Sequence, residues 1–448
     1  MILRPFRWLS VLAAAAIAAV AAAAQDRPPV IVIPGLTGSE LINQKTGEVV
    51  WFKAPRSKDD DLRLPITLDP RKAGDNLVAG DILRKVKFGI FPSVDVYGGL
   101  IEAFKSKAGY HEESWDEPTE SGAEASIYIY AYDWRLDNVE NARRLIRKVE
   151  AVKARLKRPD LRFTIVAHSM GGIIARYAAM YGDADLPTGG RRPQPTWAGS
   201  KHFARIFLLG TPSEGSPGAL SSLINGFAIG GVNINLPWVQ NLSRFDVFTI
   251  PSAYQLMPAP GSVRMLDSGL DPMNVDLYDV RTWTRYGWNT IQDKRFAREF
   301  TPAEVREAPA FLKLMLDRAR RLHEALAAGG SGSGYEFDLV GSDCKPSLDT
   351  IVLYRDAKKN SWRTIFKPTA LTRPGGAKIT SDELKELILA DGDGVVTRRS
   401  LEARGSDDAA PQIRVRTAKF LCEEHTKLAA NAEIQDHLIN SILGVTGN

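Results

Sequence analysis

A serine at position 169 stands between a β-rich stretch and a helical one, and its near neighbours are small. Residues 163–172 read FTIVAHSMGG, with Ala167 two positions before Ser169 and Gly171 two positions after it. A turn tight enough to push a side chain out of a sheet needs small residues there, because bulk would collide with neighbouring backbone. The pattern predicts a nucleophile elbow, G-x-S-x-G with alanine in the first position, that exposes the Ser169 hydroxyl.

A serine hydroxyl is a poor nucleophile by itself and needs a base that is oriented by an acid. On a strand–turn–helix scaffold the order along the chain is serine, acid, histidine. His425 and His437 are the histidines that follow a suitable acid. His437 falls opposite the apolar face of the helical stretch 427–443, so we expect it to be solvated. His425 precedes that stretch in a loop, and we predict that it is the base.

The acid is expected in the glycine-rich stretch DGDGVV, residues 391–396. Glycines let the chain turn tightly, so that a carboxylate can reach an imidazole N–H. We favour Asp393 over Asp391, because an apolar pair that returns to the core follows Asp393 closely. A DxDG loop also suggests calcium, but the further acids and the terminal Glu of an EF-hand are absent after Gly394.

An oxyanion hole needs two backbone N–H donors, and side-chain polarity is irrelevant to them. One is the amide of Met170, which the elbow directs to the same space as the Ser169 hydroxyl. The second is expected from the glycine-flanked turn PGLTGS, residues 34–39, with Leu36 as the donor. The alternatives are a plain turn or a phosphate-binding loop, and the latter lacks its Gly-Lys-Ser/Thr signature.

The elements that must position these groups alternate between strand and helix. Strand-like runs are found at residues 30–33, 127–130, 163–167, 204–209, 335–341 and 413–415. Helical patterns lie between them, for example at residues 141–156 and 172–181. Continuous apolar strands alternating with helices predict an α/β fold, a mostly parallel sheet flanked by helices. Right-handed crossovers place the carboxyl ends of the strands at one edge, where sites form.

A charged pair, Asp133 and Arg135, follows the second of these runs. The two side chains could bind substrate or could pair with each other. We favour an internal ion pair that fixes the loop, and we leave both residues out of the catalytic set.

Three segments do not fit the alternation. Residues 1–24 carry two arginines, an apolar run and closing alanines, which predicts a cleaved signal peptide rather than a retained membrane anchor. The mature protein would then be exported, to a periplasm or out of the cell. Residues 40–125 hold mixed loops and a helix near 98–108. Residues 213–334 end in a Gly/Ser joint and are expected to form a cap or lid, which leaves 25–212 and 335–448 as the core.

Composition and charge exclude some classes of function. The chain has 448 residues, of which 44% are apolar and 25% charged, so a large core is expected without extra cross-links. Removing residues 1–24 leaves 56 basic side chains against 53 acidic ones, too mild an excess for dedicated nucleic-acid binding. Cys344 and Cys422 form either one disulfide or two free buried thiols. Two cysteines alone make no zinc site, and we expect neither a metal nor a cofactor.

Seven stretches of the chain resemble the lecithin:cholesterol acyltransferase and lysosomal phospholipase family of α/β-hydrolases. In family order they are VIVIPGLTGSEL (30–41), AYDWRLD (131–137), IVAHSMGG (165–172), FLLGTPSEGSPGA (207–219), PSAYQLMP (251–258), DGDGVVTRRSLEA (391–403) and EEHTKLAANAEIQDHLINSILG (423–444). The resemblance implies an α/β-hydrolase fold. It places the family's nucleophile on Ser169, its acid on Asp393, its base on His425 and its first oxyanion amide on Leu36.

The same resemblance implies a membrane-contacting region within 40–125 and a lid within 213–334. Both stretches match the family poorly, so acyl-chain and membrane specificity do not carry over. The family's usual early disulfide is missing, since Cys344 and Cys422 are placed differently.

These observations predict a serine lipase or acyltransferase that cleaves the acyl ester of a lipid, taken to be a phospholipid, through an acyl-serine intermediate. Its partners would be the lipid ester and, transiently, a membrane surface, with no nucleic acid. The motifs leave open whether water or an alcohol takes the acyl group, because both routes share the acyl-enzyme. Two alternatives remain: an esterase for small or neutral esters, and a non-catalytic lipid-binding protein on the same scaffold.

Overall fold

The computed structural model describes residues 27–53, 61–86, 93–188, 190–227, 241–329, 335–356, 360–405 and 411–445. The signal segment expected at residues 1–24 lies outside these ranges, as does most of the Gly/Ser joint before residue 335.

A seven-stranded sheet in the order β20-β13-β10-β9-β1-β8-β7 forms the centre of the molecule, and every pair of neighbours in it is parallel. Its strands are β1 (Val30–Ile33), β7 (His111–Glu113), β8 (Ser126–Ile129), β9 (Phe163–His168), β10 (Phe203–Leu209), β13 (Glu336–Gly341) and β20 (Arg414–Phe420). The predicted parallel sheet is therefore confirmed. Strand β7 was not predicted, because its short sequence HEE at the sheet edge carries no apolar signal.

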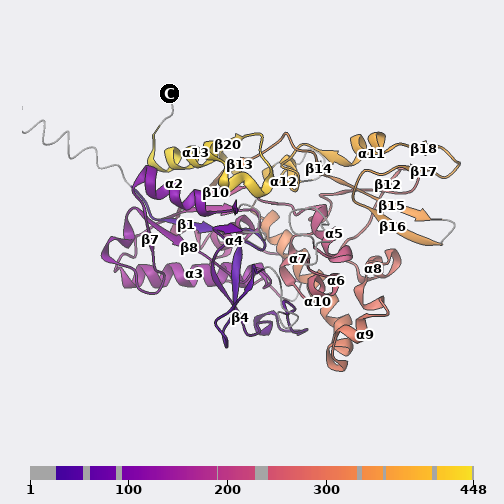
Figure 1. The fold of residues 1–448 in the computed structure, drawn as a ribbon, viewed down its shortest axis with the longest axis horizontal. Coiled ribbons are helices and arrows are strands. Elements are labelled where there is room, and N and C mark those ends of the chain that lie inside the picture. Colours follow the sequence, from indigo (N-terminus) through magenta and orange to yellow (C-terminus); the bar gives the residue numbers. More distant parts are fainter. Residues whose placement is uncertain are drawn as a thin grey trace, which may run out of the picture.

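Helices cover both faces of this sheet, because successive side chains of β1 point to opposite faces and both sets are buried against helices. Ile31 and Ile33 pack into one buried cluster with α3 (Asn138–Arg155), α4 (Met170–Tyr181) and α10 (Pro302–Ala327). Val30 and Val32 point the other way, into a cluster with α2 (Gly98–Ala108) and α13 (Ala432–Leu443). Figure 1 shows α2 and α13 along one side of the sheet and α3 along the other. None of the described helices is long and apolar enough to cross a membrane.

The residues between 213 and 334 contribute short helices that extend the main core. They are α5 (Pro217–Asn225), α6 (Arg244–Phe248), α7 (Pro251–Gln255), α8 (Val280–Tyr286) and α9 (Phe296–Glu299). Their aromatic side chains, among them Phe248, Tyr254 and Trp283, are buried in the same cluster as Ile31. Tight N-terminal caps stabilise several helices, and Thr301 forms a capping box with Glu304 at the start of α10.

Smaller sheets surround the centre. One has the order β12-β11-β15-β16 and joins β11 (Arg264–Leu266) and β12 (Pro272–Met273) to β15 (Thr350–Asp356) and β16 (Ser361–Ile365). This sheet thus unites part of the expected insertion with residues that follow it, and Figure 1 places β15 and β16 at the opposite end from β7. The boundaries of the insertion stay a prediction.

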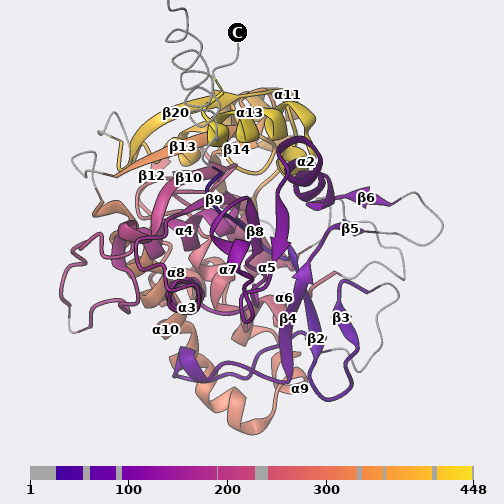
Figure 2. The same cartoon turned by 90° about the vertical axis from the view of Figure 1, so that its left-hand side faces the viewer.

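A second small sheet, β3-β2-β4, consists of β2 (Ser39–Asn43), β3 (Val49–Trp51) and β4 (Leu77–Ile82), and Figure 2 shows it beside the central strands. The remaining described strands and α-helices are short: β5 (Lys85–Val86), β6 (Val94–Asp95), β14 (Ser347–Leu348), β17 (Leu371–Thr372), β18 (Lys378–Ile379), β19 (Leu389–Ala390), α11 (Ser381–Ile388) and α12 (Arg398–Glu402). Short 3₁₀ helices are found at Pro70–Lys72, Glu120–Ala123, Ser200–His202 and Thr290–Gln292.

The loop after β8 is held by the predicted ion pair. Arg135 is fully buried, and its guanidinium donates to Asp133 at 2.8 Å and to Asp75 at 2.7 Å. The internal ion pair is therefore confirmed, and Asp75 joins it from the distant segment before β4. The ion pairs of the buried Arg135 with Asp133 and with the partly exposed Asp75 tie the β2–β4 region to the carboxyl edge of the sheet.

We expect Arg135→Met to lower the free energy of unfolding by about 3–5 kcal/mol, because it leaves two carboxylates without their cation. Urea denaturation measures the change. The matched control is Arg281→Met, whose guanidinium is 91% exposed and pairs with Asp279, and which should cost less than about 1 kcal/mol. Equal losses for the two variants would contradict a structural role for the buried pair.

Candidate active site

Ser169 occupies the turn between β9 and α4 with φ 53° and ψ −124°, a left-handed conformation that is rare for a residue with a side chain. The turn is packed closely on its neighbours. A Cβ atom on Gly171 would lie 2.6 Å from the Pro34 carbonyl oxygen, and one on Gly172 would collide with Thr211. The glycines therefore let the loops after β1 and β10 approach the serine, which is the geometry that the motif predicts.

The structure brings Ser169, His425 and Asp393 together from three separate segments. His425 Nε2 lies 2.9 Å from Ser169 Oγ, and His425 Nδ1 lies 2.7 Å from Asp393 Oδ2. His425 opens the 3₁₀ helix His425–Ala430, and its main-chain N–H donates to the Asp393 carbonyl at 2.9 Å. A carboxylate beside Nδ1 keeps the proton on that nitrogen, so Nε2 can accept the proton of the serine hydroxyl.

The Asp393 carboxylate is buried and fully engaged. Its Oδ1 accepts from the amides of Val395 and Val396 at 3.0 and 2.7 Å, while Oδ2 faces His425. Burial by itself would raise the pKa of Asp393, but the attraction of His425 and these hydrogen bonds outweigh it and hold the pKa below its usual value. Asp391, the alternative, is exposed, and the structure does not place it at His425.

The two expected oxyanion donors flank the serine. A Cβ on Gly35 would lie 2.8 Å from Ser169 Cβ, so the turn that carries Leu36 passes directly beside the nucleophile. Met170 is the first residue of α4, where a helix has unpaired amides and a partial positive charge. Within the described ranges, neither the Leu36 nor the Met170 amide has a hydrogen-bond acceptor. Both remain able to bind an anion.

Cys344 and Cys422 form a disulfide, with 5.4 Å between their Cα atoms, which decides between the two alternatives for these cysteines. The bridge joins the loop after β13 to the segment just before His425. The next residue in that loop, Lys345, donates its amide to the Gly392 carbonyl at 2.9 Å. The disulfide therefore holds the segments of His425 and Asp393 side by side.

We expect the double variant Cys344→Ser/Cys422→Ser to lose about 2–4 kcal/mol of unfolding free energy, because the bridge restricts the unfolded chain. Urea denaturation with and without dithiothreitol measures it. The reductant should destabilise the wild-type protein to the level of the variant and leave the variant unchanged. Insensitivity of the wild-type protein to complete reduction would contradict this expectation.

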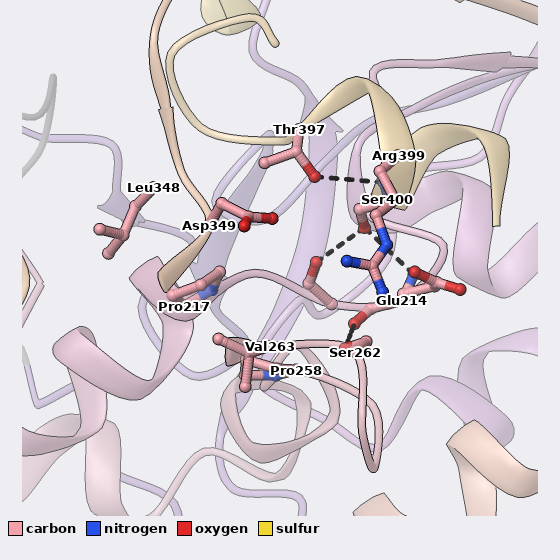
Figure 3. A pocket seen from close by; sticks show the side chains of 11 residues that line it. Glu214, Pro217, Pro258, Ser262, Val263, Leu348, Asp349, Thr397, Arg399 and Ser400 are labelled. Carbon is pink, nitrogen blue, oxygen red and sulfur yellow. Dashed lines mark hydrogen bonds between the residues drawn. The ribbon is translucent and has the colours of Figure 1, made fainter. Parts of the chain in front are cut away.

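The segment after β10 is braced against the loop that carries Asp393. The Ser400 hydroxyl donates to the Gly215 carbonyl at 2.8 Å and accepts from the Glu214 amide at 3.2 Å (Figure 3). Ser216 donates to the Val395 carbonyl at 2.9 Å. The cavity drawn in Figure 3 measures about 20 Å³, room for about one water molecule and too little for an acyl chain.

A larger cavity of about 470 Å³ lies near β4 and the start of α10, with Arg63, Asp75 and Glu304 in its wall. No residue of the Ser169, Asp393 and His425 set lines it. Among the described residues, no group of three or more His, Cys, Asp or Glu side chains is placed to hold a metal ion.

Sequence reasoning missed two buried residues of the site, Tyr97 and His168. The Tyr97 hydroxyl lies 2.7 Å from His168 Nδ1, and His168 Nε2 lies 3.0 Å from the His425 carbonyl oxygen. The position of His168 next to Ser169 was a usable signal, whereas nothing in the sequence around Tyr97 pointed to the site. The prediction that His437 is solvated is wrong: it is half-buried, and burial lowers its pKa.

Part of the chain matches a known protein family. The family model described as lecithin:cholesterol acyltransferase matches residues 114–297. The resemblance to that family is confirmed. The matched range holds Ser169 and the Asp133–Arg135 loop, and it supports an enzyme of the lipase or acyltransferase type.

Solved structures match this chain at low sequence identity. A chain of the Tle4–Tli4 complex is 14% identical with a TM-score of 0.55, over 94% of this chain and 98% of that one. The Bacillus licheniformis lipase BlEst2 in its mature form is 12% identical with a TM-score of 0.36, over 93% and 92%. A search of curated protein sequences gave no match. The parallel sheet with helices on both faces and the elbow between β9 and α4 confirm the α/β-hydrolase fold.

Proposed function

We propose that this protein is a serine lipase or acyltransferase that cleaves the acyl ester of a lipid through an acyl-serine intermediate. The observation that carries the proposal is the continuous hydrogen-bonded chain from Ser169 through His425 to Asp393. A nucleophile, a base and an orienting acid in this order are what acyl transfer requires. The unpaired amides of Leu36 and Met170 beside the nucleophile add support, because they suit a developing oxyanion.

In the first half of the reaction, Ser169 Oγ forms a bond to the ester carbonyl carbon while His425 Nε2 takes the hydroxyl proton. The carbonyl oxygen becomes an anion that the Leu36 and Met170 amides stabilise. The bond to the leaving alcohol then breaks, and His425 returns the proton to that alcohol. In the second half, water or another alcohol gives its proton to His425 while its oxygen forms a bond to the acyl carbon. The bond from that carbon to Ser169 Oγ then breaks, and His425 returns the proton to Ser169.

The substrate class proposed is a phospholipid at a membrane surface, and its support is the family match over residues 114–297. We also propose that the protein acts after export. The Cys344–Cys422 disulfide favours this location, because such bonds persist in a periplasm or outside the cell and are rare in a reducing cytosol.

We expect Ser169→Ala to lower kcat for release of fatty acid from phosphatidylcholine vesicles by about 10⁶-fold, since no nucleophile remains. Asp393→Asn should cost about 10⁴-fold, because an amide favours the wrong tautomer of His425. The matched control is Asp391→Asn, an exposed carboxylate two residues away, which should keep wild-type kcat. Labelling by a fluorophosphonate should follow the same order, and labelling that survives Ser169→Ala would disprove the assignment of the nucleophile.

Mixed vesicles of phospholipid and sterol distinguish the fates of the acyl group. Mass spectrometry of the products identifies free fatty acid with lysophospholipid, which means hydrolysis, or sterol esters formed at the expense of free acid, which means acyl transfer. Acyl loss from small or neutral esters alone would replace the phospholipid proposal with an esterase. No acyl loss from any ester would leave a lipid-binding protein.

A further inference from the structure

His168 directly precedes the nucleophile Ser169 in the sequence, and its ring contacts Tyr97 on one side and His425 on the other. Its exposed fraction is 8%, and that of Tyr97 is 2%. Its two ring nitrogens each have one partner: the Tyr97 hydroxyl at 2.7 Å from Nδ1, and the His425 carbonyl oxygen at 3.0 Å from Nε2. The ring also lies beside the imidazole of His425, with 5.0 Å between the centroids.

The partners decide where the protons are. A carbonyl oxygen can only accept, so His168 Nε2 carries the hydrogen and donates it to His425. In a neutral ring Nδ1 then accepts, and the Tyr97 hydroxyl donates to it. The Tyr97 oxygen still accepts from the Gly35 amide at 2.8 Å. Four groups thus form one chain in which every donor points the same way, from Gly35 through Tyr97 and His168 to His425.

The neutral state of His168 that this chain needs is enforced by its surroundings. Burial lowers the pKa of His168 to about 3, and the charge of the neighbouring His425 acts in the same direction. The hydrogen bond to the His425 carbonyl and the Asp393 carboxylate act against them and are outweighed. At neutral pH the ring therefore has one donor and one acceptor, which are the two roles that the chain assigns to it.

The hydrogen-bonded chain starts and ends at segments that act in the proposed mechanism. Gly35 directly precedes Leu36, an oxyanion donor, and His425 is the base. The Pro34 and Thr37 carbonyls of the same turn are held by Tyr132 at 2.9 Å and by Trp51 at 2.9 Å. The Gly35 amide has Tyr97 as its acceptor, so this bond completes the fixation of the turn.

The His425 peptide is held from two directions. Its N–H donates to the Asp393 carbonyl at 2.9 Å, and its carbonyl accepts from His168 at 3.0 Å. The acid therefore fixes one side of the base residue, and His168 fixes the other.

We infer that His168, with Tyr97, is a positioning residue that sets the distance between the oxyanion turn at Leu36 and the base His425 across Ser169. This inference rests on the proposed function, because it concerns the same reaction. The hydrogen bonds of the His168 ring go to the Tyr97 hydroxyl and the His425 main chain and not to Ser169 Oγ or the His425 ring nitrogens, so removing it should lower kcat and leave KM nearly unchanged.

Single substitutions can remove the two hydrogen bonds of the His168 ring separately. His168→Gln keeps a donor near the position of Nε2 and loses the acceptor for Tyr97. His168→Asn keeps an acceptor near the position of Nδ1 and loses the donor to His425, and His168→Leu loses both. Tyr97→Phe removes the hydroxyl and keeps the ring. His202→Leu is the matched control. This buried histidine lies at the amino end of β10, whereas the site lies at the carboxyl ends of the strands.

Steady-state hydrolysis of a soluble p-nitrophenyl ester by the purified full chain measures kcat and KM. We expect kcat to fall about 100-fold for His168→Leu, the scale of a misplaced catalytic group. His168→Gln, His168→Asn and Tyr97→Phe should each lose about tenfold, the worth of one hydrogen bond. KM should stay within about twofold for all, and His202→Leu should keep both constants within about twofold.

Urea unfolding of each variant separates positioning from stability. Rescue of part of the His168→Leu loss by His168→Gln or His168→Asn at equal fraction folded supports the inference. Should His168→Leu not fold, Tyr97→Phe carries the same test. Ser169→Ala at wild-type activity would refute the proposed function. If Ser169→Ala is inactive, three results for the His168 variants would refute this inference and leave the proposed function standing. They are a wild-type kcat, a change in KM alone, or a loss of kcat no greater than that of His202→Leu.

Discussion

The left-handed backbone of Ser169 is the constraint on which the site depends. A non-glycine residue in this conformation costs about 1–3 kcal/mol and persists only where the surroundings determine it fully. Here β9 is paired on both sides, with β1 and with β10, and the Ser169 amide donates to the Leu209 carbonyl at 2.8 Å. The loops after those two strands then close on Gly171 and Gly172, where only hydrogen atoms fit. The packing that holds the turn in this conformation also places Leu36 beside the nucleophile.

The base and the acid reach the turn from much farther along the chain. Ser169 and His425 are separated by 256 residues, and parallel crossovers make the meeting possible by placing the strand ends at one edge. The last step of alignment is local. A disulfide, the Lys345 bond to Gly392 and the His425 bond to Asp393 join the end of β13 to both loops. Covalent and hydrogen-bonded links therefore supply the precision that the sheet alone does not.

Much of the fold and the Ser169, Asp393 and His425 set could be predicted because their signals are local. Buried parallel strands read as apolar runs, and the elbow fits within five residues. Other features lacked such a signal. Strand β7 is short and charged, and Tyr97 meets Gly35 and His168 across 62 and 71 residues. His437 looked solvated on its own helix, but neighbouring elements cover it. The disulfide stayed open because a sequence does not give the distance between two Cα atoms. Contacts that depend on which elements become neighbours were the ones missed.

The neutrality of His168 also bears on the proposed chemistry itself. His425 gains a positive charge when it takes the proton of Ser169, and the buried Asp393 carboxylate favours that charge. A charged His168 with its ring 5.0 Å away would oppose it by about 3 kcal/mol at an effective dielectric constant of about 20, a factor of more than about 100 in rate. Burial prevents this by keeping the ring uncharged. A histidine beside the nucleophile can then hold the His425 peptide directly and the Gly35 turn through Tyr97, without weakening the attraction of Asp393 for a protonated His425.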